Sequence, residues 1–199
     1  MNTKIRLVAI ATLLTALAGS ARAEGFIRPS LLFVSPTMSG ASTATGFGIA
    51  AGGRFGPKAA HELSLEGAWV SWDESATYAG YHVSGTLRYQ PLLVTYRYYF
   101  GAPESPARFY VSPTAGFACT TAEVNAIGSD VNLSVSDSTW SAAYGAGVGV
   151  AIRLAPKVDL DLGYRYLHVK GSSVTISGAT VTLDDANAHI LYAGVSFRF

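Results

Sequence analysis

The sequence has 199 residues, of which 49% are hydrophobic and 12% aromatic, while only 14% are charged and the formal net charge is +1. Ordinary globular domains carry roughly 25% charged residues, so the composition argues against a typical water-soluble protein, and the near-zero charge argues against a nucleic-acid binder. A single cysteine, Cys119, excludes an intramolecular disulfide.

The first 23 residues have the pattern of a secretory signal peptide. Lys4 and Arg6 precede an apolar run, and a cleavage motif of small residues ends at Ala23. The apolar run has about 12 residues, whereas a membrane-spanning helix needs about 20, so a membrane anchor is disfavoured. We therefore expect two regions, a signal peptide over 1–23 and one barrel domain over 24–199.

Beyond residue 23, apolar residues alternate with small or polar ones, which is the period of a β-strand. The clearest segment is 92–100, where one face is apolar and the other carries Thr95 and Arg97. The first segment is weaker because it contains Pro29. In chain order the eight segments are about 26–34, 46–55, 61–70, 92–100, 108–118, 138–154, 158–167 and 190–199.

The connections between these segments alternate between long and short. The short ones are 56–59, 101–106 and 155–157, and the long ones are about 35–45, 71–83, 120–138 and 168–187. One end with long loops and one with short turns is typical of an up-and-down outer-membrane barrel. We therefore predict an all-β fold, an eight-stranded antiparallel up-and-down transmembrane β-barrel with both termini in the periplasm.

The alternative is a soluble β-sandwich or a lipocalin-like barrel, and the less apolar face of each strand decides between them. That face is rich in small residues and its charges nearly balance, which suits a narrow lumen better than a water-exposed surface. The expected lumen charges are Arg54, Arg97, Arg153, Arg165, Arg198, Glu62, Glu66, Asp159 and Asp161.

Aromatic residues on the apolar face fall near the strand ends, where membrane barrels carry interfacial girdles. The expected loop-end girdle is Trp69, Trp140 and Tyr166, and the expected turn-end girdle is Phe55, Phe100, Phe109, Phe197 and Phe199.

The chain resembles the family of small eight-stranded bacterial outer-membrane barrels, which includes the transmembrane domain of outer membrane protein A and the opacity- and W-type barrels. The matching stretches are LLVTYRYYFG, RFYVSPTAGFA, YGAGVGVAIRL, VDLDLGYRYLH and AGVSFRF. The resemblance implies an outer-membrane location among lipid and lipopolysaccharide. It also implies that the barrel-assembly machinery reads the terminal aromatic, Phe199. The fold alone implies no activity, since this family hosts several functions.

An enzymatic role has little support in the sequence. Some barrels of this kind modify lipid A through a His-x-Ser pair, and His82 and Ser84 have that spacing, but they lie too early in the chain and lack the flanking residues. His168 and His189 fall on neighbouring strand ends, but a metal site needs three or four converging ligands. We expect no catalytic, cofactor-binding or metal site and no cofactor.

The long loops are the remaining candidates for function, because loops on a rigid scaffold often carry it. They are acidic, and their acids could bind divalent cations that bridge lipopolysaccharide. We expect a non-enzymatic barrel with a structural or surface-interaction role and an unidentified extracellular ligand. The alternative is a small low-conductance pore or a hydrophobic-solute conduit, since eight strands leave little interior space. The charged loop residues are Asp73, Glu74, Glu123, Asp130, Asp137, Asp184, Asp185 and Lys170.

The fourth strand raises a question of register. Its apolar residues fall on odd numbers from Val83 to Tyr89 and on even numbers from Leu92 to Phe100. A regular strand cannot keep both sets on one face, so the pattern predicts a bulge near Gln90 and Pro91. The alternative is that residues 81–89 stand above the membrane, where alternation need not be kept.

Overall fold

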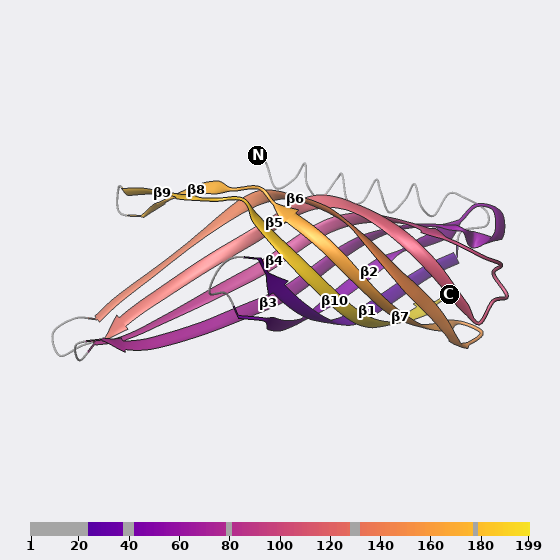
Figure 1. Cartoon of the computed structure of the whole chain (residues 1–199), viewed down its shortest axis with the longest axis horizontal. Coiled ribbons are helices and arrows are strands. Elements are labelled where there is room, and N and C mark those ends of the chain that lie inside the picture. The colour runs from indigo at the N-terminus through magenta and orange to yellow at the C-terminus, as the bar shows by residue number, and fades with distance from the viewer. Residues whose placement is uncertain (1–23, 38–41, 79–80, 128–131, 177–178) are drawn as a thin grey trace.

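Eight strands close into an antiparallel barrel in the computed structural model, which describes residues 24–37, 42–78, 81–127, 132–176 and 179–199 (Figure 1). Their spatial order is β1-β10-β7-β6-β5-β4-β3-β2, so consecutive barrel strands are neighbours and the predicted up-and-down fold is confirmed. The barrel strands are β1 (Glu24–Pro36), β2 (Ala44–Phe55), β3 (His61–Tyr78), β4 (Tyr81–Tyr99), β5 (Ala107–Ile127), β6 (Asn132–Ala155), β7 (Val158–Val169) and β10 (Ala186–Arg198).

The remaining elements are small. Strands β8 (Ser172–Ile176) and β9 (Ala179–Leu183) form a separate hairpin, and η1 (Pro57–Ala59) is a single 3-10 turn. Gly56 enters this turn with φ 78°, in the left-handed region that favours glycine. Among the described residues, no helix is long and apolar enough to cross a membrane.

The last strand closes the barrel against the first. Leu31 of β1 lies opposite Ala193 of β10, and the Phe199 amide donates to the Gly25 carbonyl at 2.9 Å. The predicted alternation holds along β10, where Leu191 and Phe197 point outward and are 58% and 49% exposed, while Tyr192, Gly194 and Ser196 turn inward. A closed sheet leaves no barrel edge unpaired, which a hydrocarbon environment requires.

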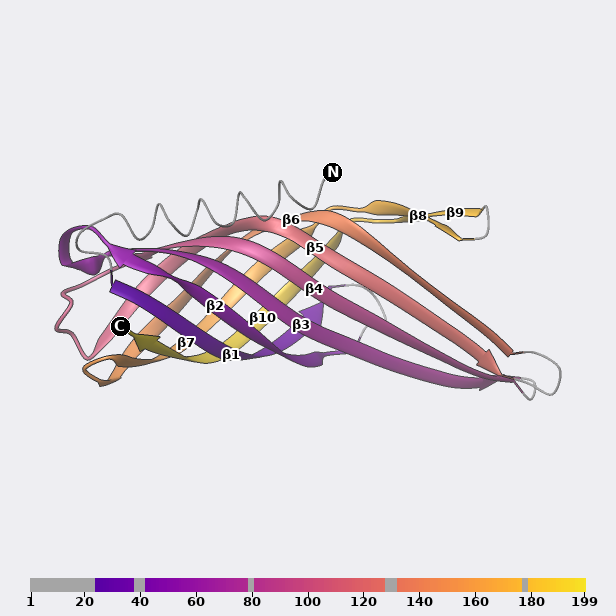
Figure 2. The same ribbon diagram turned by 180° about the vertical axis from the view of Figure 1, so that it is seen from behind.

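Two segments predicted as long loops are largely strand instead. β3 and β4 stay paired up to Tyr78 and Tyr81, so most of 71–83 is sheet, and β5 and β6 stay paired through most of 120–138. Strands β3 to β6 therefore project beyond the rest of the barrel, and the β8–β9 hairpin within 168–187 projects separately (Figures 1 and 2). Pairing satisfies main-chain donors and acceptors that an irregular loop would leave to water.

The predicted bulge near Gln90 and Pro91 is wrong. The register of β4 against β5 is continuous from His82 to Tyr99, and its register against β3 is the same on both sides of Pro91. The prediction assumed that apolar residues face outward along the whole strand. Tyr89 instead turns inward and packs against an apolar part of the lumen. The register shift recorded among the described strands lies in β6, between Arg153 and Ala155.

Candidate functional site

The middle of the lumen holds a network of buried charges, which we call the charged layer. Glu62 of β3 lies at its centre and is fully buried. Its carboxylate accepts from the Arg28 guanidinium at 3.1 Å and from Arg54 Nε at 3.0 Å. The Tyr99 hydroxyl donates to the same carboxylate at 2.7 Å. Four strands thus meet at one side chain.

Asp161 of β7 is the second centre of the charged layer, and it too is fully buried. Arg97 and Arg28 both form ion pairs with its carboxylate, the latter at 3.4 Å. The Tyr110 hydroxyl donates to it at 2.6 Å and also contacts the Tyr192 hydroxyl at 2.8 Å. An isolated buried charge costs several kcal/mol, so these crossed contacts are what make the layer stable.

The charged layer extends toward both ends of the barrel. Glu66 pairs with Arg165 at 2.7 Å on the loop side. On the turn side Asp159 pairs with Arg54 at 2.8 Å and with Arg198 at 3.2 Å. Cations and anions from different strands therefore pair along much of the lumen.

Eight of the nine charges predicted for the lumen are buried or half-buried there, whereas Arg153 lies exposed at the turn-end rim of the lumen. Its side chain is exposed, and its guanidinium donates to the Pro103 carbonyl in the turn after β4. Arg153 still pairs with Asp159 in regular register and keeps the inward face, but it lies near the turn end of β6, where its side chain reaches solvent.

The sequence reasoning missed Arg28 and Arg108, which are 2% and 7% exposed. Arg28 was overlooked because Pro29 weakened the pattern of the first strand. Alternation of Ile27, Leu31 and Phe33 on the outward face carries the signal that would have placed Arg28 inward.

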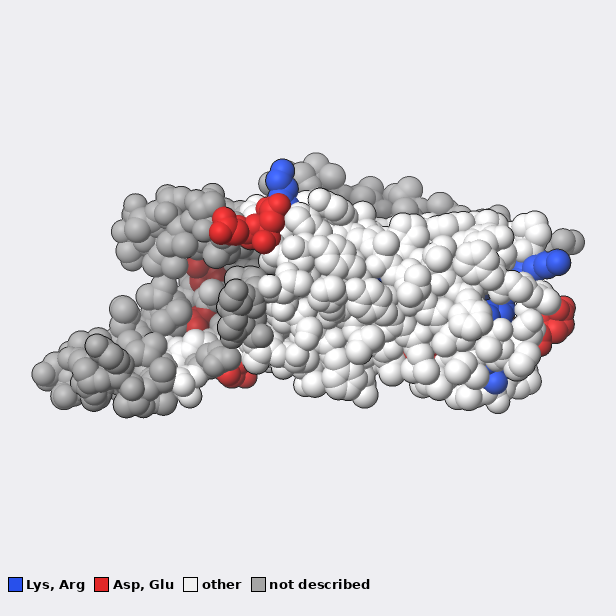
Figure 3. All heavy atoms as spheres, viewed as in Figure 1, with Lys and Arg blue, Asp and Glu red and all other residues white. Residues whose placement is uncertain are grey.

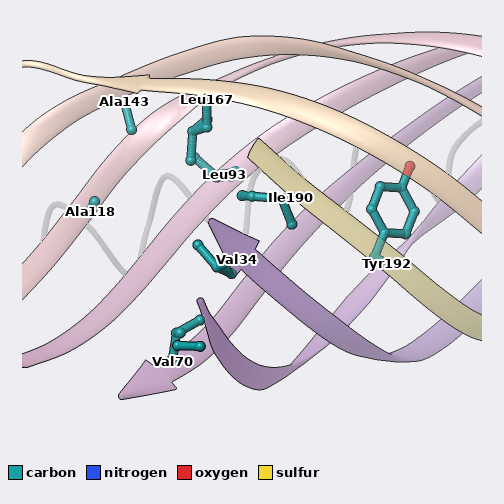
Figure 4. Packing of buried hydrophobic residues seen from close by; sticks show 9 residues of the cluster. Val34, Val70, Leu93, Ala118, Ala143, Leu167, Ile190 and Tyr192 are labelled. Carbon is teal, nitrogen blue, oxygen red and sulfur yellow. The ribbon is translucent and has the colours of Figure 1, made fainter. Parts of the chain in front are cut away.

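A second layer, the apolar layer, fills the lumen between the charged layer and the loop end (Figure 4). Leu167 is fully buried, and Val34 and Leu93 are 1% and 3% exposed. Below it lies a cavity of about 50 Å³ bordered by Arg28, Arg165 and Tyr89. A liquid water molecule occupies about 30 Å³, so this cavity is small. The buried members of the apolar layer are Val34, Ala44, Val70, Leu93, Ala118, Ala143, Leu167, Ile190 and Tyr192.

The projecting part of β3 to β6, which we call the projecting sheet, begins where β2 and β7 end. The last β2–β3 pair joins Gly46 to Val70, and no described strand pairs with β3 on that side beyond it. The edge of β3 from Ser71 to Tyr78 is therefore free of partner strands within the described chain. Asp73 lies on this edge and is exposed, and charged residues on an edge oppose unspecific strand pairing.

The acidic character predicted for the loops is only partly retained. Asp73, Asp184 and Asp185 are exposed, but Glu123 forms an ion pair with Arg88 at 2.7 Å on the projecting sheet. Arg88 was not counted among the loop charges, so the surface is less acidic than predicted. Asp137 accepts a hydrogen bond from the Ser138 amide, while the Glu74 side chain and Asp130 lie outside the described residues.

The histidines do not converge. His168 contacts Asn187 at 2.8 Å, and His189 contacts the Tyr164 hydroxyl at 2.7 Å. His82 and Ser84 lie at the start of β4, and the His82 side chain is outside the described residues. Within the described chain, no group of three or more His, Cys, Asp and Glu side chains is arranged to hold a metal ion.

Comparison with known families agrees with this architecture. A model of the outer membrane protein beta-barrel domain matches residues 6–199. The chain belongs to this family. Its location is therefore the bacterial outer membrane, and the outward faces of its strands meet lipid.

Two solved structures illustrate the family's fold. Neisserial surface protein A shares 18% identity with a TM-score of 0.61, covering 88% of this chain and 97% of its own. Ail, the attachment invasion locus protein of Yersinia pestis, solved with the heparin analogue sucrose octasulfate, shares 18% identity with a TM-score of 0.60, covering 89% and 99%. Among curated protein sequences, none matches the chain.

The lipid-facing surface is consistent with membership of this family. Leu31, Phe47 and Val148 are 63%, 56% and 54% exposed, and each would be costly to leave in water. The face of the barrel seen in Figure 3 is almost free of charge along its length, and the charged side chains visible there gather toward its two ends. The girdle residues predicted from the sequence are exposed or half-buried on this outer face, as expected.

Proposed function

We propose that the protein is a non-enzymatic barrel that acts at the cell surface through its projecting sheet. The observation that carries this proposal is the contrast between a lumen filled by two layers and a sheet that extends past the barrel with the edge of β3 uncovered. In this proposal the turn end and both termini lie in the periplasm, and residues 1–23 are a cleaved signal peptide. The two structural neighbours named above are a surface protein and an attachment protein, which supports a surface role.

The proposed partners follow from this placement. Lipid and lipopolysaccharide surround the barrel, and exposed acids such as Asp184 and Asp185 can bind divalent cations that bridge lipopolysaccharide. The barrel-assembly machinery reads the terminal aromatic, Phe199, which is 70% exposed. Deleting Phe199 should therefore lower outer-membrane yield more than it lowers the stability of protein already folded. An unchanged yield would contradict this assignment.

The surface role is tested by shortening the projecting sheet. Residues 74–85 and 122–137 would each be replaced by Asn-Gly, which favours a tight hairpin turn. The shortened barrel should remain heat-modifiable on gels, because its membrane part is unchanged. Cells that display it should lose adhesion to a panel of immobilised extracellular-matrix proteins and glycans, relative to cells with the full protein. Equal adhesion of both strains would overturn the proposal.

Two further measurements separate this role from the alternatives. A filled lumen predicts no stable conductance in planar bilayers, and steady channels would favour a pore. A non-enzymatic barrel predicts an unchanged lipid A mass spectrum in an overexpressing strain, and a shifted spectrum would favour a lipid A-modifying enzyme.

One observation favours a hydrophobic-solute conduit as the second candidate. The β3–β4 ladder has no recorded pairs between Gly67–Leu92 and Val70–Tyr89, where Pro91 cannot donate a hydrogen bond. Gly67 and Pro91 border the cavity under the apolar layer, and a Cβ on Gly67 would meet nothing within 4 Å. A small apolar solute could leave sideways here. Replacing Gly67 with Trp should then slow uptake of such solutes into liposomes, whereas unchanged uptake would exclude this route.

A further inference from the structure

The turn end of the lumen contains a second cavity, separate from the one under the apolar layer. Its volume is about 120 Å³, equivalent to about four liquid water molecules at 30 Å³ each. Four arginines border it, against two acids. The charged residues of its wall are Arg54, Arg108, Arg153, Arg198, Glu24 and Asp159.

Two of these arginines are already neutralised. Arg198 pairs with Glu24 at 3.0 Å and with Asp159 at 3.2 Å. Arg54 pairs with Asp159 at 2.8 Å and with Glu62, whose carboxylate belongs to the charged layer. Both acids of the cavity wall are thus engaged by these two arginines.

The other two arginines form no ion pair with the described residues, and the Arg108 guanidinium lies over the Tyr99 ring at 4.9 Å from its centroid. Arg108 donates to the Ala59 carbonyl at 3.2 Å and to the Lys58 carbonyl at 3.4 Å. Its Nε is buried and has no hydrogen-bond partner among the described residues. Arg153 donates to the Pro103 carbonyl. A guanidinium has five N–H donors, so both side chains keep donors free.

Neighbouring carboxylates do not remove this surplus. Glu104 lies on the turn that borders the cavity and is exposed, and it forms no ion pair with the described residues. The wall therefore carries two cations in excess of its acids, and one of them, Arg108, is 7% exposed. An unpaired buried cation is unfavourable unless an anion joins it.

We infer that this cavity binds a tetrahedral phosphate group. Arginine forks match phosphate oxygens in geometry and form charge-assisted hydrogen bonds with them. Phosphate has five heavy atoms and fits a space of this size after displacing water. With the turn end in the periplasm, as proposed above, the phosphate comes from an inner-leaflet phospholipid headgroup or from free phosphate. The site is independent of the projecting sheet at the opposite end.

In the first test, inorganic phosphate is titrated into the full folded protein in detergent at low ionic strength. Calorimetry measures the binding. Arg108→Gln should weaken binding at least tenfold and Arg153→Gln at least threefold. Arg108→Lys should fall between wild type and Arg108→Gln, because it keeps the charge but loses the fork. Arg88→Gln, which removes an arginine from the projecting sheet, is the matched control and should bind like wild type.

A second arm distinguishes the two phosphate sources. Native mass spectrometry would compare nanodiscs that contain phosphatidylglycerol with nanodiscs that contain a phosphate-free galactolipid. A headgroup site predicts that phosphatidylglycerol stays bound and that Arg153→Gln releases it. A free-phosphate site predicts binding in calorimetry and no lipid selectivity.

If Arg108→Gln fails to fold, Arg153→Gln still tests the proposal. Arg153 is exposed, so its replacement leaves no buried group unpaired. The inference is overturned if neither phosphate source binds, or if binding is the same in Arg153→Gln and in wild type. The adhesion assay reports on the projecting sheet alone, so each proposal can fail without the other.

Discussion

The charged layer and the apolar layer occupy the same lumen but are held together by different forces. In the charged layer, Glu62 and Asp161 bind side chains from opposite walls through ion pairs and hydroxyl donors. In the apolar layer, Leu93 and Leu167 belong to one cluster of buried apolar side chains and are 3% and 0% exposed. The comparison shows that the inside of a membrane barrel need not be polar throughout. Apolar packing occupies one part of the lumen, and paired charges occupy another.

We expect the largest loss of folding stability when one of the two central carboxylates of the charged layer is removed. Glu62→Ala leaves Arg28, Arg54 and Arg97 short of a partner, and breaking a buried ion pair costs about 3–5 kcal/mol. Urea unfolding in lipid vesicles, followed by gel mobility, measures this loss. The exposed Glu123→Ala, which breaks only the pair with Arg88, should cost less than about 1 kcal/mol. Equal losses in the two variants would mean that burial does not determine how much an ion pair contributes to the free energy of unfolding.

In the apolar layer, we expect substitutions to lower the free energy of unfolding through lost packing instead. Leu167→Ala removes a fully buried side chain, and such changes cost roughly 3 kcal/mol. The matched Leu154→Ala, at a site 60% exposed, should cost much less. Conductance should stay unchanged in Leu167→Ala, because the charged layer still fills the lumen. A new steady conductance would show that the apolar layer alone closes the barrel.

The outer wall gives a third test, since it must stay apolar while the lumen accepts arginine. Val195 of β10 faces lipid, next to inward-facing Ser196. Val195→Arg should destabilise the folded barrel by about 2 kcal/mol, because a charge then faces hydrocarbon. Val195→Leu is the conservative control. Unfolding free energies of the two variants in the same vesicles would agree only if this position were in contact with water.

We expect the smallest loss of stability at the glycines that leave room for the tyrosine rings in the lumen. A Cβ on Gly163 would lie 2.3 Å from Cζ of Tyr192, so Gly163→Ala should cost about 1–2 kcal/mol by overpacking. Gly67→Ala is the control, because a Cβ there meets nothing within 4 Å. Comparable unfolding curves for the two variants would show that the tyrosine rings can move aside.

Much of the barrel architecture can be predicted from the sequence alone, because period-two alternation indicates which side chains face lipid. Phe109, Val111 and Phe117 of β5 are exposed as predicted, while Tyr110 between them is 1% exposed. The charges on the inward face could be assigned to the lumen for the same reason, since hydrocarbon excludes them.

Local pattern fails where a residue's neighbours come from distant strands. Arg28 was missed because Pro29 obscured the alternation of β1, and Arg153 is exposed because it lies near the turn end of β6. The length of β3 to β6 was also hidden, because Ser, Thr and acidic residues suit both loops and exposed strands, and only pairing across strands decides between them.

The sequence by itself determined the strand faces, the closing strand and the balance of charges inside the barrel. Each of these three features depends on the residue type at a given position, so the alternation along each strand is enough to predict it. Only the tertiary structure decided that the lumen divides into a charged layer and an apolar layer, and that Arg108 is left without an acidic partner. Both depend on which side chains from different strands reach the same height in the barrel. The stagger of the strands sets that height, and residues along one strand do not reveal it.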